Sequence, residues 1–154
     1  MRRVAGSLAE YVYFAALTLW VGGVWSIGYI VAPILFATLD DKQLAGLVAG
    51  KMFTFVGWIG LGCGVYVLLY SRLREEKNRV FSWCVFAMLV LTVAMLFGIQ
   101  PLMAQLKLQA FPLDVMQSPL RARFVFWHGL SSVLYLLQSL LGIVVATLAR
   151  PASK

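Results

Sequence analysis

Charged residues are scarce in this chain of 154 residues, of which 12% are Asp, Glu, Lys or Arg and 62% are hydrophobic. Soluble domains average about 25% charged and roughly 45–50% apolar residues, so the composition excludes an ordinary soluble domain. Charged residues are missing altogether from four stretches, 11–39, 52–71, 80–106 and 124–149. A helix needs about 20 mostly apolar residues to span the hydrocarbon of a bilayer, and each of these stretches is long enough.

These stretches predict an all-α fold, an integral membrane antiparallel four-helix bundle that occupies residues 1–154 as a single transmembrane domain. We expect helices at about residues 7–33, 41–71, 79–109 and 119–149, with the last three partly extended beyond the bilayer. Pro33 should bend or end the first helix and Pro101 should kink the third, because proline lacks the backbone N–H. Ser118 and Pro119 form a start signal for the last helix.

Histidine, cysteine and acidic residues are also rare, with one, two and six copies respectively. Cys63 and Cys84 lie inside predicted spans and so form no extracellular disulfide framework, and no zinc-type spacing of Cys and His occurs. No carboxylate lies within a span at the depth of His128, so a hydrolytic triad has no group to orient the imidazole. Glu10 is interpreted as a membrane-edge residue that reaches water or a nearby arginine, or else as part of a proton relay.

Basic residues give the chain a net charge of +7. They lie at the ends of the apolar stretches and not on one soluble face, which argues against nucleic acid as a partner. One membrane side carries the larger set, Arg2, Arg3, Arg72, Arg74, Lys77, Arg79, Arg150 and Lys154. The other side carries Lys42, Lys51, Lys107, Arg121 and Arg123. The positive-inside rule therefore places both termini in the cytoplasm, after an uncleaved first helix whose apolar run is too long for a secretory signal.

The 119–149 helix carries a stripe of polar and small residues on one side, formed by His128, Ser131, Ser132, Tyr135, Gln138, Ser139 and Gly142. A lipid-facing surface has no need of polar groups, so we expect the stripe to face other helices or a small cavity. The predicted ligand-binding residues are His128, Ser131, Ser132, Tyr135, Ser139, Arg121 and Gln100. For His128 three interpretations stay open: a hydrogen-bonded packing residue, a ligand-binding or proton-handling group, and a haem ligand.

Methionines gather near the outer membrane edge in this topology. The predicted metal-binding residues there are His128, Met52, Met103 and Met116, because imidazole and thioether ligands together suit a soft cation such as Cu(I). Met88 and Met95, one heptad apart, would extend a thioether path inward. The alternative is that these methionines fill gaps in the helical core.

Small residues mark the predicted contact faces between helices, where they let two backbones approach closely. They are Gly22 and Ser26 in the 7–33 helix and Gly57, Gly60 and Gly64 in the 41–71 helix. Gly60 and Gly64 alone form a GxxxG pattern, which indicates helix packing and names no partner.

Three segments resemble a known family: Phe124-x3-His128-Gly129-Leu130-Ser131-Ser132, Pro33-x-Leu35-Phe36-x2-Leu39 and Gly46-Leu47-Val48-x2-Lys51-x-Phe53. They resemble the transmembrane protein 205-like domain family, which in bacteria is an uncharacterised four-helix membrane domain. The resemblance covers nearly the whole chain. It implies four spans in the plasma membrane, the inner membrane of a bacterium, and a link to metal-drug or copper resistance.

The same family is similar at a distance to the copper-resistance D membrane domain and to a four-helix protoporphyrinogen oxidase that holds haem. Its motif picks out His128, Gly129, Ser131 and Ser132, with the Pro33 and Phe36 turn and Phe53. Where relatives usually carry Asn seven residues after the histidine, this chain has Tyr135. The oxidase also uses a first-helix histidine and an intramembrane lysine, and this chain has neither.

We therefore expect a non-enzymatic membrane protein that binds, or helps to transport, a small solute or a soft metal such as copper. Its site would be a polar pocket lined by the 119–149 helix. The first alternative is a membrane haem or redox enzyme, and the second is a structural subunit of a larger membrane complex. The expected partner is the lipid bilayer, with a homo-oligomer or a larger complex as further options.

Overall fold

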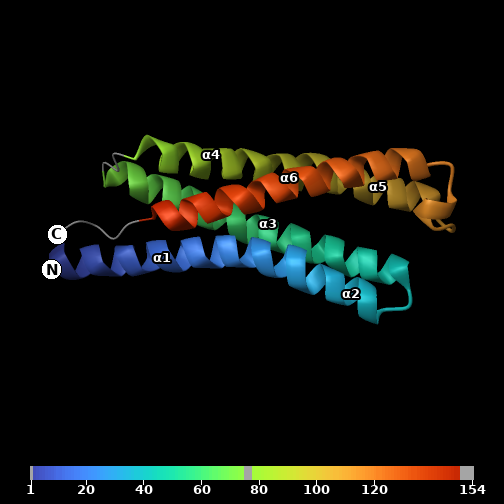
Figure 1. Cartoon of the computed structure of the whole chain (residues 1–154), viewed down its shortest axis with the longest axis horizontal. Helices are drawn as coiled ribbons and strands as arrows, with labels where there is room; N and C mark the ends of the chain where they lie inside the picture. Colours follow the sequence, from blue (N-terminus) through green and yellow to red (C-terminus); the bar gives the residue numbers. More distant parts are fainter. Residues whose placement is uncertain (1, 75–77, 150–154) are drawn as a thin grey trace.

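Four helical rods make up the computed structural model, which describes residues 2–74 and 78–149 and their side chains from Leu8 onward. The first rod joins α1 (Arg2–Ser26), a π-helical turn η1 (Ile27–Val31) and α2 (Ala32–Thr38), and the second is α3 (Lys42–Leu73). The third joins α4 (Arg79–Val93), a second π-helical turn η2 (Ala94–Ile99) and α5 (Gln100–Ala110). A 3-10 turn, η3 (Val115–Gln117), leads to the fourth rod, α6 (Arg121–Leu148). Consecutive rods run in opposite directions, and α1 begins at the end of the bundle where α6 ends (Figure 1).

Each proline inside a rod follows a π-helical turn. Proline has no N–H, and its ring collides with the carbonyl four residues earlier, so a regular α-helix is disfavoured there. Before Pro33 the N–H of Ala32 bonds to the carbonyl of Ile27, and before Pro101 the N–H of Gln100 bonds to the carbonyl of Met95. A π-helical turn is wider than an α-helical one, so each rod accommodates its proline and continues as a helix. The first rod therefore continues to Thr38, beyond the boundary expected at Pro33.

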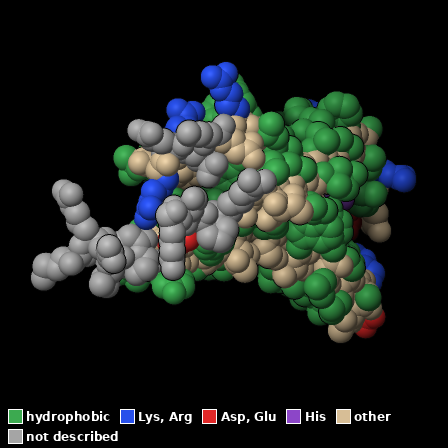
Figure 2. All heavy atoms as spheres, turned by 60° about the vertical axis from the view of Figure 1, so that its left-hand side comes forward, with side chains coloured by type: hydrophobic (Ala, Val, Ile, Leu, Met, Phe, Trp, Pro, Cys, Tyr) green, Lys and Arg blue, Asp and Glu red, His purple; other side chains and the backbone are tan. Residues whose placement is uncertain are grey.

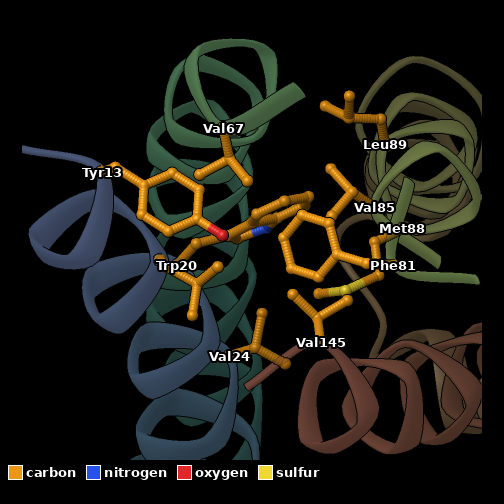
Figure 3. Close-up of a cluster of buried hydrophobic side chains, with 10 residues drawn as sticks. Tyr13, Trp20, Val24, Val67, Phe81, Val85, Met88, Leu89 and Val145 are labelled. Atoms are coloured by element: carbon orange, nitrogen blue, oxygen red, sulfur yellow. The ribbon is translucent and has the colours of Figure 1, made fainter. Parts of the chain in front are cut away.

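The core lies in the half of the bundle that holds the α3–α4 connection. α1 packs along α3, α3 along α4 and α4 along α6, and a shorter contact between α6 and α1 closes the ring. The buried cluster contains Tyr13, Leu17, Trp20, Val24, Val67, Phe81, Val85, Met88, Leu89 and Val145 (Figure 3). Trp20 fills the notch that the missing side chains of Gly60 and Gly64 leave in α3. Gly60 and Gly64, the GxxxG pair, thus lie where α1 and α3 approach each other closely.

The small residues of α1 behave differently. Gly22 and Ser26 are exposed, and a Cβ atom added to Gly22 would meet no atom within 4 Å. α1 turns its Leu17, Trp20 and Val24 side towards the bundle, which leaves the Gly22 side outside. The prediction that Gly22 and Ser26 pack against another helix is therefore wrong for the single chain.

Large hydrophobic side chains cover the outside of the rods. Phe55, Trp83 and Phe126, for example, are 65–69% exposed. Figure 2 shows broad areas of hydrophobic side chains on the described part of the visible face. All four rods are long and apolar enough to cross a membrane. Such a surface is unfavourable in water and suited to lipid, so these features indicate a multi-pass membrane protein that contacts the bilayer.

Candidate functional site: a polar cavity between two hairpins

The polar stripe of α6 divides into buried and exposed parts. Ser131, Gln138, Ser139 and Gly142 are buried and Tyr135 is half-buried, whereas His128, Gly129 and Ser132 are exposed. The prediction that the whole stripe faces protein is therefore wrong for His128 and Ser132. The reason is their place near the α5 end of the bundle. There the hairpin of the first two rods, from α1 to α3, diverges from the hairpin of the last two rods, from α4 to α6 (Figure 1).

His128 makes its described contacts within α6. Its ring stacks on Phe124, with centroids 5.8 Å apart and planes 12° apart. The hydroxyls of Ser131 and Ser132 donate to the backbone carbonyl of His128, at 2.7 and 3.0 Å. The O–H donors of both serines are therefore used on their own helix. Neither serine bonds to the imidazole, whereas the packing interpretation of His128 expected such a bond.

Tyr135 and Ser139 connect α6 to the first rod. The Tyr135 hydroxyl donates to the carbonyl of Val24, and the ring fills the space beside Gly28 that a Cβ atom would occupy. The Tyr29 hydroxyl donates to Ser139 Oγ at 3.0 Å. Gly28 and Tyr29 belong to η1, so the π-helical turn of the first rod meets the α6 stripe together with the end of α1 that carries Val24.

Gln138 connects α6 to α4. Its Nε2 donates to Thr92 Oγ1 at 3.0 Å, and the Thr92 hydroxyl donates to the carbonyl of Met88 at 2.8 Å. Gln138 and Thr92 are 5% and 3% exposed, so this chain of bonds is shielded from the outside of the bundle. Hydrogen bonds between helices in membranes typically contribute about 0.6 kcal/mol each, which makes this pair a modest but specific link.

A cavity of about 30 Å³ lies between the two hairpins, and Met95 and Leu96 of the π-helical turn η2 form part of its wall. Four polar side chains line it: Thr92, Gln100, Tyr135 and Gln138. The rest of its wall is uncharged and formed by Val24, Phe53, Val56, Gly57, Met95 and Leu96. A water molecule needs about 10–15 Å³ of such space, so the cavity has room for one or two molecules of that size.

Hydrogen-bonding groups remain available in this cavity. Gln138 donates one bond, to Thr92, while the Gln100 carboxamide has no hydrogen bond to any described residue. A carboxamide offers two donors and an acceptor with two lone pairs. The cavity can therefore supply both donors and acceptors to an uncharged guest.

Lys107 joins the two hairpins about two helical turns further along α5 than the cavity residue Gln100. Its Nζ donates to the carbonyl of Gly46 in α3 at 3.1 Å and lies 5.6 Å from the ring centroid of Phe124 in α6. A Cβ atom on Gly46 would lie 3.4 Å from Nζ, so the glycine leaves room for the ammonium. We call Lys107, Gly46 and Phe124 the Lys107 clasp. It is the described polar link between the hairpins at the end where they diverge.

The structure brings together only part of the predicted site. Of the predicted ligand-binding residues, Gln100 and Tyr135 line the cavity, whereas Arg121 is exposed at the start of α6. Thr92 was missing from every predicted set. Gln138 belonged to the predicted polar stripe but not to the predicted ligand-binding residues, while Phe53 stood only in the family motif and Met95 only in the predicted thioether path. Thr92 carried a usable signal, since it is a hydroxyl residue inside the long apolar stretch 80–106.

The predicted metal-binding residues are dispersed. Met52 borders a separate surface groove, and His128, Met103 and Met116 line neither that groove nor the cavity. Met95 is the thioether at the cavity. Within the part of the chain that the structure describes, no three His, Cys, Asp or Glu side chains are grouped so that they could hold a metal ion.

Comparison with known protein families identifies the family of the chain. The family model of the domain of unknown function DUF4149 matches residues 15–112, well over half of the chain. The chain belongs to the DUF4149 family. The match begins within α1 and ends just after α5, before α6, so it includes every cavity residue except Tyr135 and Gln138. No curated protein and no solved structure matches the chain.

Proposed function

We propose that this DUF4149 protein binds a small, uncharged, hydrogen-bonding solute in the cavity between its hairpins. The observation that carries the proposal is the unused carboxamide of Gln100 beside Gln138, Thr92 and Tyr135 in an uncharged cavity. Polar groups inside a membrane are costly and usually mark a ligand path or a link between helices. Because the wall offers no counter-charge, an ion would be bound poorly compared with a neutral molecule.

The solute would reach the cavity from the end closed by the Lys107 clasp. In the proposed orientation both termini are cytoplasmic, so this end faces the outside of the bacterial inner membrane. A guest larger than water needs the hairpins to separate there, since the cavity measures about 30 Å³. The resemblance to the transmembrane protein 205-like family supports the four-span topology of this proposal.

A soft metal is the alternative ligand. Cu(I) favours thioether and thiolate ligands, and the cavity offers one thioether, from Met95, among oxygen and amide groups. The set formed by His128, Met52, Met103 and Met116 would have to assemble through a conformational change. The hydrogen-bonding solute therefore fits this cavity better than copper does.

Ligand-observed NMR on purified protein, with acetamide and urea as probes, tests the proposal. Gln100→Leu keeps the side chain's size and removes its donors and acceptor, and we expect binding at least tenfold weaker than in the wild type. Gln105→Leu is the matched control, because Gln105 is exposed on the same helix. Equal binding by all three proteins would overturn the proposal, and Cu(I) binding that is lost in His128→Ala would support the metal instead.

A further inference from the structure

A second depression lies on the outside of the bundle, between η1 and α3. Its lining is Ile27, Lys51, Met52, Phe55 and Val56, and its volume is about 350 Å³. Four of these side chains are apolar, and Phe55 is 68% exposed. Val56 also lines the polar cavity, so the two spaces lie on opposite sides of one valine. The groove faces away from the bundle, where a membrane protein meets lipid tails.

Lys51 marks the level of this groove in the membrane. The next charged residue along α3 is Arg72, and residues 52–71 between them carry no charge. At about 1.5 Å per residue this segment is about 30 Å long, which equals the thickness of the hydrocarbon. Lys51 therefore lies at the boundary of the hydrocarbon, beside the phosphate groups, and the rest of the groove lies among the acyl chains.

The protein provides no described anion for this ammonium. Lys51 is exposed and has no ion pair among the described residues. Asp41 belongs to the same rod, about 15 Å away along the helix axis. Its carboxylate already accepts the N–H groups of Gln43 and Leu44 at the start of α3. A lysine at the membrane boundary directs its ammonium to the headgroups while its alkyl chain stays on apolar surface.

We propose that this groove binds one phospholipid molecule, with an acyl chain along Ile27, Met52, Phe55 and Val56 and the phosphate at Lys51 Nζ. Charge complementarity favours this occupant, because the groove is apolar along its length and cationic where the phosphates lie. Among phospholipids, an anionic headgroup such as phosphatidylglycerol is preferred over a zwitterionic one. The site is separate from the polar cavity and stands whether or not that cavity binds a solute.

Native mass spectrometry of the detergent-solubilised full chain, titrated with phosphatidylglycerol, tests this site. We expect Lys51→Gln to bind phosphatidylglycerol at least fivefold more weakly than the wild type. Arg123→Gln is the matched control, since Arg123 is an exposed cation at the same end of the bundle, on α6. It should bind as the wild type does.

A second variant tests the apolar part of the site. Met52→Trp fills the groove and keeps the charge, so we expect it to lower phosphatidylglycerol binding as Lys51→Gln does. Diacylglycerol, which has no phosphate, should bind the wild type weakly and should not distinguish it from Lys51→Gln. The proposal is overturned if Lys51→Gln binds phosphatidylglycerol as tightly as the wild type does. It is also overturned if Arg123→Gln weakens phosphatidylglycerol binding as much as Lys51→Gln does.

Discussion

The indole of Trp20 in α1 lies directly against Gly60 in α3, where an added Cβ atom would lie 2.5 Å from the indole Nε1. Trp20 is 1% exposed and stands within the buried cluster (Figure 3). The same ring also occupies the space beside Gly64. A rigid indole cannot withdraw as the end of a flexible side chain can. The contact between the first two rods therefore depends on the absence of side chains at these two positions.

Gly60→Ala should destabilise the protein by about 1–3 kcal/mol, the usual cost of adding a methyl group to a well-packed core. Gly62→Ala is the matched control, because Gly62 is exposed on the same helix and an added Cβ would meet nothing within 4 Å. The control should be neutral or slightly stabilising, since alanine favours a helix over glycine by up to about 1 kcal/mol. Unfolding by SDS in mixed micelles measures both variants. Equal free energies for the two would show that the Trp20 contact is not tight.

The Thr92–Gln138 hydrogen bond should appear as a coupling free energy between α4 and α6. Thr92→Val and Gln138→Leu each remove one partner, and the double variant removes both, so a double-mutant cycle isolates the pair. We expect a coupling of about 0.6 kcal/mol, and no more than about 1.7 kcal/mol, as for other hydrogen bonds between membrane helices. The same micelle unfolding measurement provides the four free energies. A coupling of zero would mean that the bond contributes nothing to the folded state.

The four rods follow from the sequence because each depends on local composition. A long stretch without charge can satisfy its backbone inside lipid by bonds within the stretch only as a helix, whatever its neighbours are. Pro33 shows the limit of that reasoning. Its missing N–H predicts a disturbance, but whether the helix ends or continues through a π-helical turn depends on packing. Here Tyr135 of α6 fills the space beside Gly28 and holds that turn in place.

The site was harder to predict because it depends on how helices are rotated and where they diverge. Gly22 and Gly60 are each followed by a small residue four positions later, Ser26 and Gly64, yet of the two glycines only Gly60 faces a large partner. Gln138 and Thr92 lie far apart in the chain, and nothing local shows that α6 and α4 meet at their level. His128 is on the same side of α6 as the buried residues of the stripe, but it lies where the hairpins separate and is therefore exposed. Long-range geometry, and not residue type, decides these three cases.

The proposed orientation can be tested with cysteines placed at the two ends of the bundle. Gln117→Cys and Arg74→Cys change exposed residues near η3 and at the end of α3, in a Cys63→Ala, Cys84→Ala background. With both termini cytoplasmic, a membrane-impermeant maleimide should label position 117 in spheroplasts and position 74 only after permeabilisation. The reverse pattern would contradict the orientation and would move the Lys107 clasp to the cytoplasmic side.

The Lys107 clasp should control how far the two hairpins separate. Lys107→Met keeps the length of the side chain but removes the ammonium that reaches the carbonyl of Gly46 and the ring of Phe124. A cation–π contact at a partly exposed site is worth about 0.5–1 kcal/mol, so the change should shift the hairpin equilibrium without unfolding the protein. Spin labels at the exposed Leu44 and Ala122, on α3 and α6, should report a longer and broader distance distribution.

Lys42→Met provides the control for this experiment. The Lys42 ammonium donates to the carbonyls of Phe36 and Leu39, at 2.7 and 2.9 Å, and so acts within the first hairpin. Its loss removes the same charge from the same end of the bundle without breaking a link between hairpins. The label distances should therefore match those of the wild type. If Lys107→Met left the distances unchanged, or if Lys42→Met altered them equally, Lys107 would not hold the hairpins together, and access to the cavity would have to be controlled elsewhere.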